Sequence, residues 1–173
     1  MTDRELLIKS LKLYPFQIIK EKFTQKNNFT LIEPITKITD NIFLGNMNGA
    51  SDINALKSNN IHYIINCTKN IPNYFEQDFK YLRIPIDDTF GQSIEKYFDV
   101  SYNFINNNNA HNIFIHCHAG ISRSATILIA YLMRKNNIDC NSALNIVKNK
   151  RSIINPNTEF MKALYNYKFV MSG

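Results

Sequence analysis

Cysteine is scarce in this sequence, and long apolar runs are absent. The three cysteines, Cys67, Cys117 and Cys140, are odd in number and have no paired spacing. This pattern argues against a disulfide framework and favours a reducing compartment. The longest mostly apolar run, residues 125–133, is about half as long as a helix that crosses a bilayer. A disulfide-stabilised fold and a membrane-spanning one are therefore not expected.

The two ends of the sequence carry no recognisable targeting signal. Residues 1–4 do not begin a basic-then-apolar leader, and Thr2 stands where N-myristoylation requires glycine. The last four residues contain no cysteine for prenylation. We therefore expect a cytoplasmic protein.

The composition is that of one ordinary domain. With 173 residues, 45% hydrophobic and 20% charged, the chain is long enough to bury a core. It shows no internal repeat and no second domain boundary. The formal net charge of +6 suits anionic partners such as phosphorylated acidic peptides, nucleic acid or acidic membrane surfaces, and does not choose among them.

The most informative stretch runs from Asn112 to Arg134. Residues 112–116 are short, apolar and rich in Ile, which predicts a strand, and residues 124–133, without Gly or Pro, predict a helix. In the loop between them, Gly120 permits a positive φ, so that successive backbone N–H groups can turn inward. Together with the positive end of the helix dipole, this loop is suited to an oxyanion.

Three side chains in this stretch supply chemistry for phosphoryl transfer. Cys117 is the only nucleophile at the start of the loop, and a thiol at a helix N-terminus beside a guanidinium has its pKa lowered to roughly 3.5–7.5. Arg123 can return over the loop and grip two phosphate oxygens with its planar fork. Ser124 can donate a hydrogen bond to the sulfur, which stabilises it as a leaving group.

Two other interpretations of these residues remain open. Cys117 could be a small buried residue, with His116 and His118 as ordinary side chains at a strand end. A metal site is the second, because these three residues are adjacent. Adjacent residues of an extended segment point to opposite faces, however, and no Cys-x2-Cys or His-x3-His partner exists elsewhere in the sequence. We expect neither a metal nor another cofactor.

The order His116-Cys117-x5-Arg123-Ser124 resembles the signature loop of the cysteine-dependent protein phosphatases. The run HCHAGISRSATILIAYLM is most similar to the dual-specificity branch, in particular to catalytic domains of the MAP-kinase-phosphatase kind. The resemblance spans about residues 35–170 and implies that Cys117 is the nucleophile of a phosphocysteine intermediate. The loop positions that would hold the phosphoryl oxygens are His118, Ala119, Gly120, Ile121, Ser122 and Arg123.

A carboxylic acid is also needed, to protonate the leaving oxygen and then to activate water. Asp88 fits best, since residues 84–89, Ile-Pro-Ile-Asp-Asp-Thr, resemble the acid loop of the family, in which the second acidic position is catalytic. Asp87 offers the same chemistry one position earlier. Either aspartate could instead be a turn or capping residue ahead of Ser93.

Further residues are expected to support the loop. His116 would bury its ring behind the loop and hydrogen-bond to the backbone, whereas His118 would shape the rim. Asn157 matches the Pro-Asn element of the family and would hydrogen-bond to the loop, although helix capping explains it nearly as well. Cys67 is either a small core residue or the partner of Cys117 in a reversible disulfide that protects the nucleophile from over-oxidation.

Strands and helices alternate along the chain. This predicts a single α/β domain with a mostly parallel central sheet, helices on both faces, and a site beyond the C-terminal ends of the strands. The elements expected outside the signature stretch are a hairpin of residues 35–38 and 41–44, strands 61–66 and 79–86, and helices 50–59, 93–105 capped by Ser93, 141–150 and 157–170.

The domain boundaries follow from the same pattern. Residues 35–173 are expected to form the catalytic domain, and residues 1–34 an amphipathic helical arm. No docking domain like the one that precedes many MAP-kinase phosphatases is expected, because only this arm precedes the catalytic pattern. The arm could pack on its own domain, form a homodimer or cover a substrate surface, or lie on a membrane.

The function implied by the resemblance is hydrolysis of phosphotyrosine and phosphoserine/threonine in proteins, without a preference that the sequence reveals. A phosphatase of phosphoinositides or RNA 5′ ends would suit the net charge of +6, but such relatives usually carry Lys in the loop, and residues 118–122 contain none. A non-catalytic phosphate-binding module usually lacks the nucleophile or the arginine, and both are present here.

Overall fold

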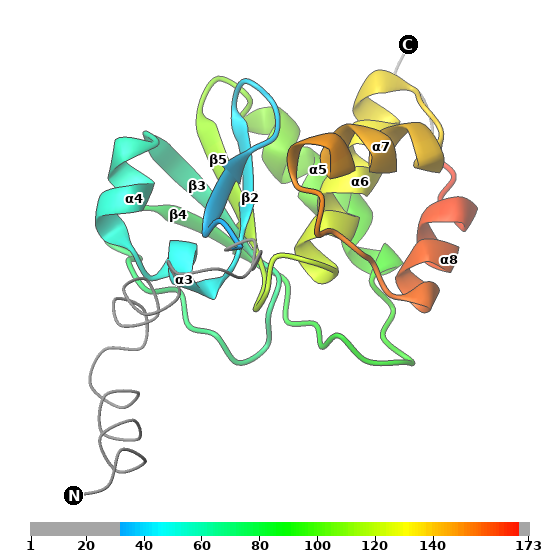
Figure 1. The fold of residues 1–173 in the computed structure, drawn as a ribbon, viewed down its shortest axis with the longest axis horizontal. Helices are drawn as coiled ribbons and strands as arrows, with labels where there is room; N and C mark the ends of the chain where they lie inside the picture. The colour runs from blue at the N-terminus through cyan, green and yellow to red at the C-terminus, as the bar shows by residue number, and fades with distance from the viewer. Residues whose placement is uncertain (1–31, 170–173) are drawn as a thin grey trace, which may run out of the picture. The chain divides into compact units, whose positions relative to one another are not determined.

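The computed structural model describes residues 32–169, so that the expected arm, residues 1–34, lies almost wholly outside the described part. Its centre is a five-stranded sheet with the order β1-β2-β5-β3-β4 (Figure 1). The strands are β1 (Ile35–Lys37), β2 (Ile42–Gly45), β3 (Ile61–Asn66), β4 (Lys80–Arg83) and β5 (Asn112–His116). β1 pairs with β2 antiparallel, and the other three pairings are parallel. The predicted sheet is confirmed.

Helices cover both faces of the sheet, as predicted. α4 (Ile53–Ser58), preceded by the short α3 (Met47–Ala50), packs on one face, and the larger helices lie on the other (Figure 1). These are the 3-10 helix η1 (Glu95–Tyr97), α5 (Phe98–Asn107), α6 (Arg123–Asn136), α7 (Cys140–Lys150) and α8 (Thr158–Asn166). α6 contacts α5, α7 and α8 and so lies inside this layer. Among residues 32–169, no helix combines the length and the apolar character that a membrane span needs.

Alternating side chains of β5 fill two apolar clusters, one on each face of the sheet. Ile113 and Ile115 belong to the cluster that includes α6, whereas Phe114 belongs to a smaller cluster with Leu56 of α4. All four side chains are fully buried, and burial of each stabilises the fold by about 1.5–3 kcal/mol. A strand buried on both faces is a continuous apolar run, which explains why β5 is recognisable in the sequence.

The single helix expected over residues 50–59 is in fact two helices. The side chain of Asn46 caps α3 by accepting hydrogen bonds from two backbone N–H groups. Asp52 caps α4 by accepting from the N–H of Ala55. Because a capping residue has extended backbone, Asp52 separates the two helices.

Three other boundaries differ from those expected. Ser93 does not cap a helix, because helical structure starts only at η1 and α5 begins without a side-chain cap. β4 is shorter than the expected strand 79–86, since Pro85 has no N–H with which to continue the pairing. α8 ends at Asn166, earlier than expected, because Tyr167 has extended backbone.

Candidate active site

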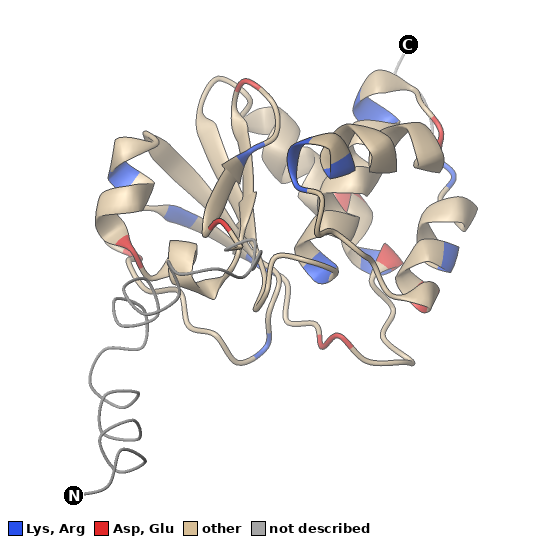
Figure 2. Cartoon of the chain, in the orientation of Figure 1, with Lys and Arg blue, Asp and Glu red and all other residues tan. Residues whose placement is uncertain are grey.

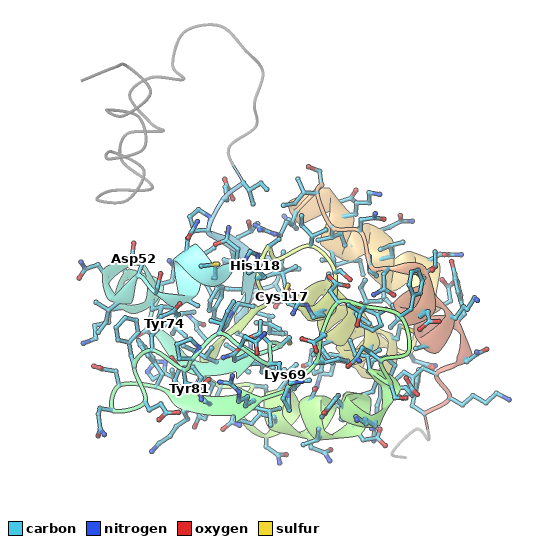
Figure 3. All side chains as sticks on the ribbon, turned by 90° about the horizontal axis from the view of Figure 1, so that it is seen from below. Asp52, Lys69, Tyr74, Tyr81, Cys117 and His118 are labelled. Atoms are coloured by element: carbon cyan, nitrogen blue, oxygen red, sulfur yellow. The ribbon has the colours of Figure 1, made fainter. Side chains whose placement is uncertain are left out.

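The signature loop, residues 117–122, connects β5 to α6 at the C-terminal edge of the sheet. β2, β3 and β5 end together there, with His116 paired to the last residue of each neighbour. Figure 3 looks onto this edge and shows Cys117 near its middle, with His118 beside it. The alternation of strands and helices in the sequence predicts a site at this same edge.

Two hydrogen-bond donors point at the sulfur of Cys117, a residue that is 1% exposed. The backbone N–H of Gly120 lies 3.3 Å from Sγ, and the hydroxyl of Ser124 lies 3.2 Å from it. Gly120 has a φ of 68°, the left-handed conformation that turns the chain back over the sulfur. Such donors stabilise negative charge on sulfur, which suits a nucleophilic thiolate and a thiolate leaving group alike.

Arg123 begins α6 and directs its guanidinium toward the chain that follows β4. Its Nη1 donates to the carbonyl of Ile86 at 3.3 Å, and its Nε lies 3.8 Å from Oδ2 of Asp88. Nε is buried and has no hydrogen-bond partner within residues 32–169. Buried guanidinium donors need acceptors, and phosphate oxygens match their planar fork.

The carbonyls of the signature loop are held from outside. Those of residues 118–121 accept hydrogen bonds at 2.9 to 3.4 Å from the backbone N–H groups of Met47 and Asn155 and from the guanidinium of Arg151. The N–H and C=O of a peptide point to opposite sides. Outward carbonyls therefore leave the loop N–H groups free to face inward, around the place where phosphoryl oxygens are expected.

Arg151 is a functional residue that the sequence analysis missed. Its side chain is buried, with 4% of the residue exposed, and burial lowers the pKa of its guanidinium. Besides the loop carbonyls, it donates to the carbonyl of Glu33 at 2.7 Å and to the hydroxyl of Thr36 at 2.8 Å. It thus ties the signature loop to the start of β1. No local signal marks this role, because basic residues are common at helix C-termini.

The two candidate acids point in different directions. Oδ1 of Asp88 accepts hydrogen bonds from the hydroxyl of Ser122 and from Nδ2 of Asn157, both at 2.8 Å. Asp87 instead lies 3.9 Å from the ammonium of Lys69, an exposed pair. Asp88 therefore lies against the signature loop and Asp87 does not, which favours Asp88 as the acid.

Asn157 makes both of the interactions that its sequence context predicts. Its Oδ1 accepts from the N–H of Phe160 and so caps α8. Its own N–H donates to the hydroxyl of Ser122 at 3.2 Å, while its Nδ2 reaches Asp88. Asn157 thus fixes the acid, the signature loop and the start of α8 relative to one another.

His116 is buried behind the loop, with 1% of the residue exposed. Its ring stacks on Phe114 at 5.5 Å between centroids, and burial lowers the pKa of His116 to about 4. The imidazole is therefore neutral at pH 7. Its Nδ1 has no hydrogen-bond partner of good geometry in the described part of the chain, while the neighbouring backbone of Cys117 opposes part of the lowering of its pKa. The side chain of His118 is exposed at the rim.

Cys67 directly follows β3 and lies beside the catalytic strand. Its N–H donates to the carbonyl of His116 at 2.8 Å. Because Asn66 pairs with His116, Cys67 and Cys117 each directly follow one residue of this pair on neighbouring strands. Both cysteines are buried and neither forms a disulfide. Burial raises the pKa of the Cys67 thiol, and the neighbouring Cys117 adds to this effect.

Within residues 32–169, no group of three or more His, Cys, Asp or Glu side chains is arranged to hold a metal ion. Figure 2 shows the Lys and Arg residues of the same part on several helices and strands, without a concentration on one element. The chemistry available at this edge of the sheet is thus that of a thiol, a guanidinium, a carboxylate and inward backbone N–H groups.

A mostly parallel sheet whose central strand delivers a Cys-x5-Arg loop to a helix N-terminus defines a cysteine-dependent phosphatase fold. A family model described as "Dual specificity phosphatase, catalytic domain" matches residues 42–169. The chain belongs to the dual specificity phosphatase catalytic-domain family, and the resemblance seen in the signature loop is confirmed.

Individual relatives agree with this family. The chain is 38% identical over 136 residues to human dual specificity protein phosphatase 9, which covers 76% of this chain and 35% of the relative. It is 40% identical over 131 residues to human dual specificity protein phosphatase 6, covering 73% of this chain and 34% of the relative. The chain thus spans about a third of the length of these curated relatives.

Solved structures show the same fold. The crystal structure of DUSP15 superposes with a TM-score of 0.72 at 38% identity and covers 76% of this chain and 85% of that one. The human tyrosine phosphatase-like serine/threonine/tyrosine-interacting protein gives a TM-score of 0.71 at 30% identity, covering 75% of this chain and 92% of that one.

Proposed function

We propose that this chain is a protein phosphatase that hydrolyses phosphotyrosine and phosphoserine/threonine monoesters through a phosphocysteine intermediate. The observation that carries the proposal is the contact between Asp88 and the signature loop. Asp88 is hydrogen-bonded to Ser122 of this loop. The first residue of the loop is Cys117, whose sulfur accepts two hydrogen bonds. A nucleophile and a proton donor are thus held at one edge of the sheet.

In the first step, the thiolate of Cys117 attacks phosphorus. The Sγ–P bond forms as the P–O bond to the substrate breaks, and Asp88 gives its proton to the departing oxygen. Arg123 and the inward N–H groups of the loop stabilise the charge on the transferred phosphoryl oxygens. The products of this step are the dephosphorylated side chain and phosphocysteine.

In the second step, water hydrolyses the intermediate. Asp88, now a carboxylate, takes a proton from the water as its oxygen bonds to phosphorus. The S–P bond breaks, its electron pair returns to Cys117, and the Ser124 hydroxyl stabilises the thiolate through the 3.2 Å hydrogen bond. Inorganic phosphate leaves, and Asp88 is protonated again for the next cycle.

The substrates that we propose are phosphorylated proteins, because the relatives are named dual specificity protein phosphatases. A cytoplasmic location is part of the same proposal, and it rests on the reducing conditions that a free catalytic cysteine requires. A homodimer through residues 1–34 has no support, since these residues lie almost wholly outside the described part of the chain.

Phosphate release tests this proposal directly. The substrates are a peptide phosphorylated on Thr and Tyr, a phosphoinositide and a 5′-triphosphorylated RNA, and the variants are Cys117→Ser, Asp88→Asn and the control Asp87→Asn. We expect turnover of both peptide residues that disappears in Cys117→Ser, falls about 10²–10⁴-fold in Asp88→Asn and changes little in Asp87→Asn. Preference for lipid or RNA would overturn the substrate class, and tight phosphopeptide binding without turnover would overturn the enzymatic function.

A further inference from the structure

The acid loop, residues 87–93, is anchored in the core at both ends and weakly supported between them. Ile86 and Ile94, which flank it, are 2% and 0% exposed. Between the loop and α8 lies a cavity of about 540 Å³, lined by Gly91 and Glu159 among others. A Cβ added to Gly91 would meet no atom within 4 Å. Packing therefore does not fix the middle of this loop.

A hydrogen bond between two residues that line this cavity holds the middle of the acid loop. Oε2 of Glu159, in the first turn of α8, accepts from the backbone N–H of Gly91 at 2.6 Å. A hydrogen bond to a carboxylate is shorter and stronger than one between neutral groups. Gly91 has a φ of 80°, which glycine adopts without strain.

The same turn of α8 also holds the acid itself. Asn157, the N-cap of α8, donates from Nδ2 to Asp88, and Glu159 is two residues further along. The start of α8 is therefore hydrogen-bonded to the acid loop at two positions, Asp88 and Gly91. Between these two positions lies Phe90, a residue that is 77% exposed and gives the loop no anchor in the core.

We propose that Glu159 is a positioning residue. It holds the acid loop in the position in which Asp88 contacts the signature loop, which is called the seated position below. Its carboxylate acts through the backbone of Gly91, to which it is hydrogen-bonded, and not on the reacting atoms. The inference rests on the proposed function, because it concerns the delivery of a proton by Asp88. Without Glu159, residues 89–93 can move over the cavity, and the seated position of Asp88 is populated less.

The leaving group provides a readout that a general loss of stability would not give. Alkoxide from phosphoserine and phenolate from phosphotyrosine depart slowly unless they are protonated, so their hydrolysis depends on a seated acid. An aryl phosphate whose phenol is strongly acidic leaves as the anion and does not need the proton. A fault in proton delivery therefore slows formation of phosphocysteine from the first kind of substrate and spares its formation from the second. Hydrolysis of phosphocysteine, in which Asp88 is the base, is the same for both.

The test compares Glu159→Ala, which removes the acceptor, with Glu159→Gln, which keeps an acceptor oxygen. Glu95 is the matched control, because it lines the same cavity, carries the same charge and is exposed. We expect Glu159→Ala to lower kcat/KM, which reports the steps up to formation of phosphocysteine, by about 5- to 20-fold on a phosphoserine peptide and by less than about twofold on the activated aryl phosphate. Glu159→Gln and Glu95→Ala should stay within about threefold of wild type on both substrates.

An equal loss on both substrates, or no loss on either, would overturn this role for Glu159. If wild type is active and Asp88→Asn shows the leaving-group dependence while Glu159→Ala does not, the proposed function stands and only this inference fails. Hydrogen exchange at the Gly91 amide gives a readout that needs no activity. Exchange should be faster in Glu159→Ala than in wild type, and unchanged exchange would overturn the inference even in an inactive protein.

Discussion

Arg151 donates a hydrogen bond from Nε to the carbonyl oxygen of Gly120 at 3.0 Å, and so joins the end of α7 to the middle of the signature loop. The same guanidinium also satisfies the carbonyls of Ala119 and Glu33. The inward orientation of the loop N–H groups thus depends on a side chain that lies outside the signature sequence. An oxyanion site needs the backbone carbonyls directed away from the anion as much as it needs the backbone N–H groups directed toward it.

Replacing Arg151 by Met should damage both stability and anion binding. The change leaves buried carbonyls without donors, and we expect the free energy of unfolding to fall by about 2–4 kcal/mol. Affinity for vanadate or phosphate should fall more than about tenfold, since the loop amides lose their fixed direction. Urea unfolding and equilibrium binding of the oxyanion measure the two effects.

Arg134→Met is the matched control for this change. Arg134 stacks on Tyr102 and pairs with the exposed Asp99, without contacting the loop. It should cost less than about 1 kcal/mol and leave oxyanion affinity unchanged. Wild-type affinity in a folded Arg151→Met protein would contradict the role given to Arg151.

Two glycines with similar backbone conformations should respond very differently to alanine. Gly120 and Gly91 both have positive φ, but a Cβ on Gly120 would overlap the carbonyl of Gly45 and lie 2.8 Å from Nη2 of Arg151, whereas one on Gly91 would meet nothing. Gly120→Ala should therefore lower the unfolding free energy by about 2–4 kcal/mol and abolish oxyanion binding. Gly91→Ala should cost about 1 kcal/mol, and equal losses in calorimetry would refute the steric argument.

The part of the site that local sequence signals predict is the part whose residues are close together in the chain, whereas Asp88 and Asn157, 34 and 35 positions from Ser122, were identified through the family resemblance. β5, the signature loop and α6 are contiguous, and each has a local signal: an apolar run, a glycine, and a helix without Gly or Pro. Cys117, Arg123 and Ser124 could be assigned for this reason. Arg151 and Glu159 could not, because their partners, Gly120 and Gly91, lie 31 and 68 positions away.

The errors in the fold have a similar origin in competing local signals. The resemblance to the family predicts one helix over residues 50–59, but Asp52 caps a new helix with its carboxylate, and this cap divides the segment. Ser93 has the right identity for an N-cap, yet Ile94 is buried and the chain becomes helical only beyond it. A local cap decided the first of these boundaries and tertiary packing the second, whereas the order of strands and helices could be predicted from the sequence.

The hydrogen bond from Ser124 to the Cys117 sulfur should matter most when sulfur leaves. Ser124→Ala should lower kcat about 10- to 100-fold, affect formation of phosphocysteine less, and produce a burst of product followed by slow turnover. Rapid-mixing kinetics and intact mass of the trapped intermediate measure this. Ser101→Ala is the control, because Ser101 is equally buried and its hydroxyl has no partner in the described part of the chain. A slowed burst in Ser124→Ala would contradict a role in the second step.

Burial of neutral His116 should make stability depend on pH. Its folded pKa of about 4 lies below the ordinary 6.5, so between these values the unfolded chain binds a proton that the folded protein does not. Stability therefore falls as pH falls from 6.5 to 4, by about 3 kcal/mol. Urea unfolding at pH 7 and pH 4.5 should show most of this loss in wild type and in the exposed control His62→Gln, and a much smaller loss in His116→Gln. The same loss in His116→Gln would assign it to other groups.

Cys67 should protect Cys117 from over-oxidation. Peroxide oxidises the Cys117 thiolate to sulfenic acid, and the Cys67 thiol then displaces water from it to form a disulfide. The raised pKa of the buried Cys67 thiol makes this second step slow, and faster at higher pH. Peptide mass mapping should find a Cys67–Cys117 link, reversed by a dithiol, in wild type and in the control Cys140→Ser. Cys67→Ser should instead accumulate sulfinic acid at Cys117. Sulfinic acid in wild type without any link would show that Cys67 is only a core residue.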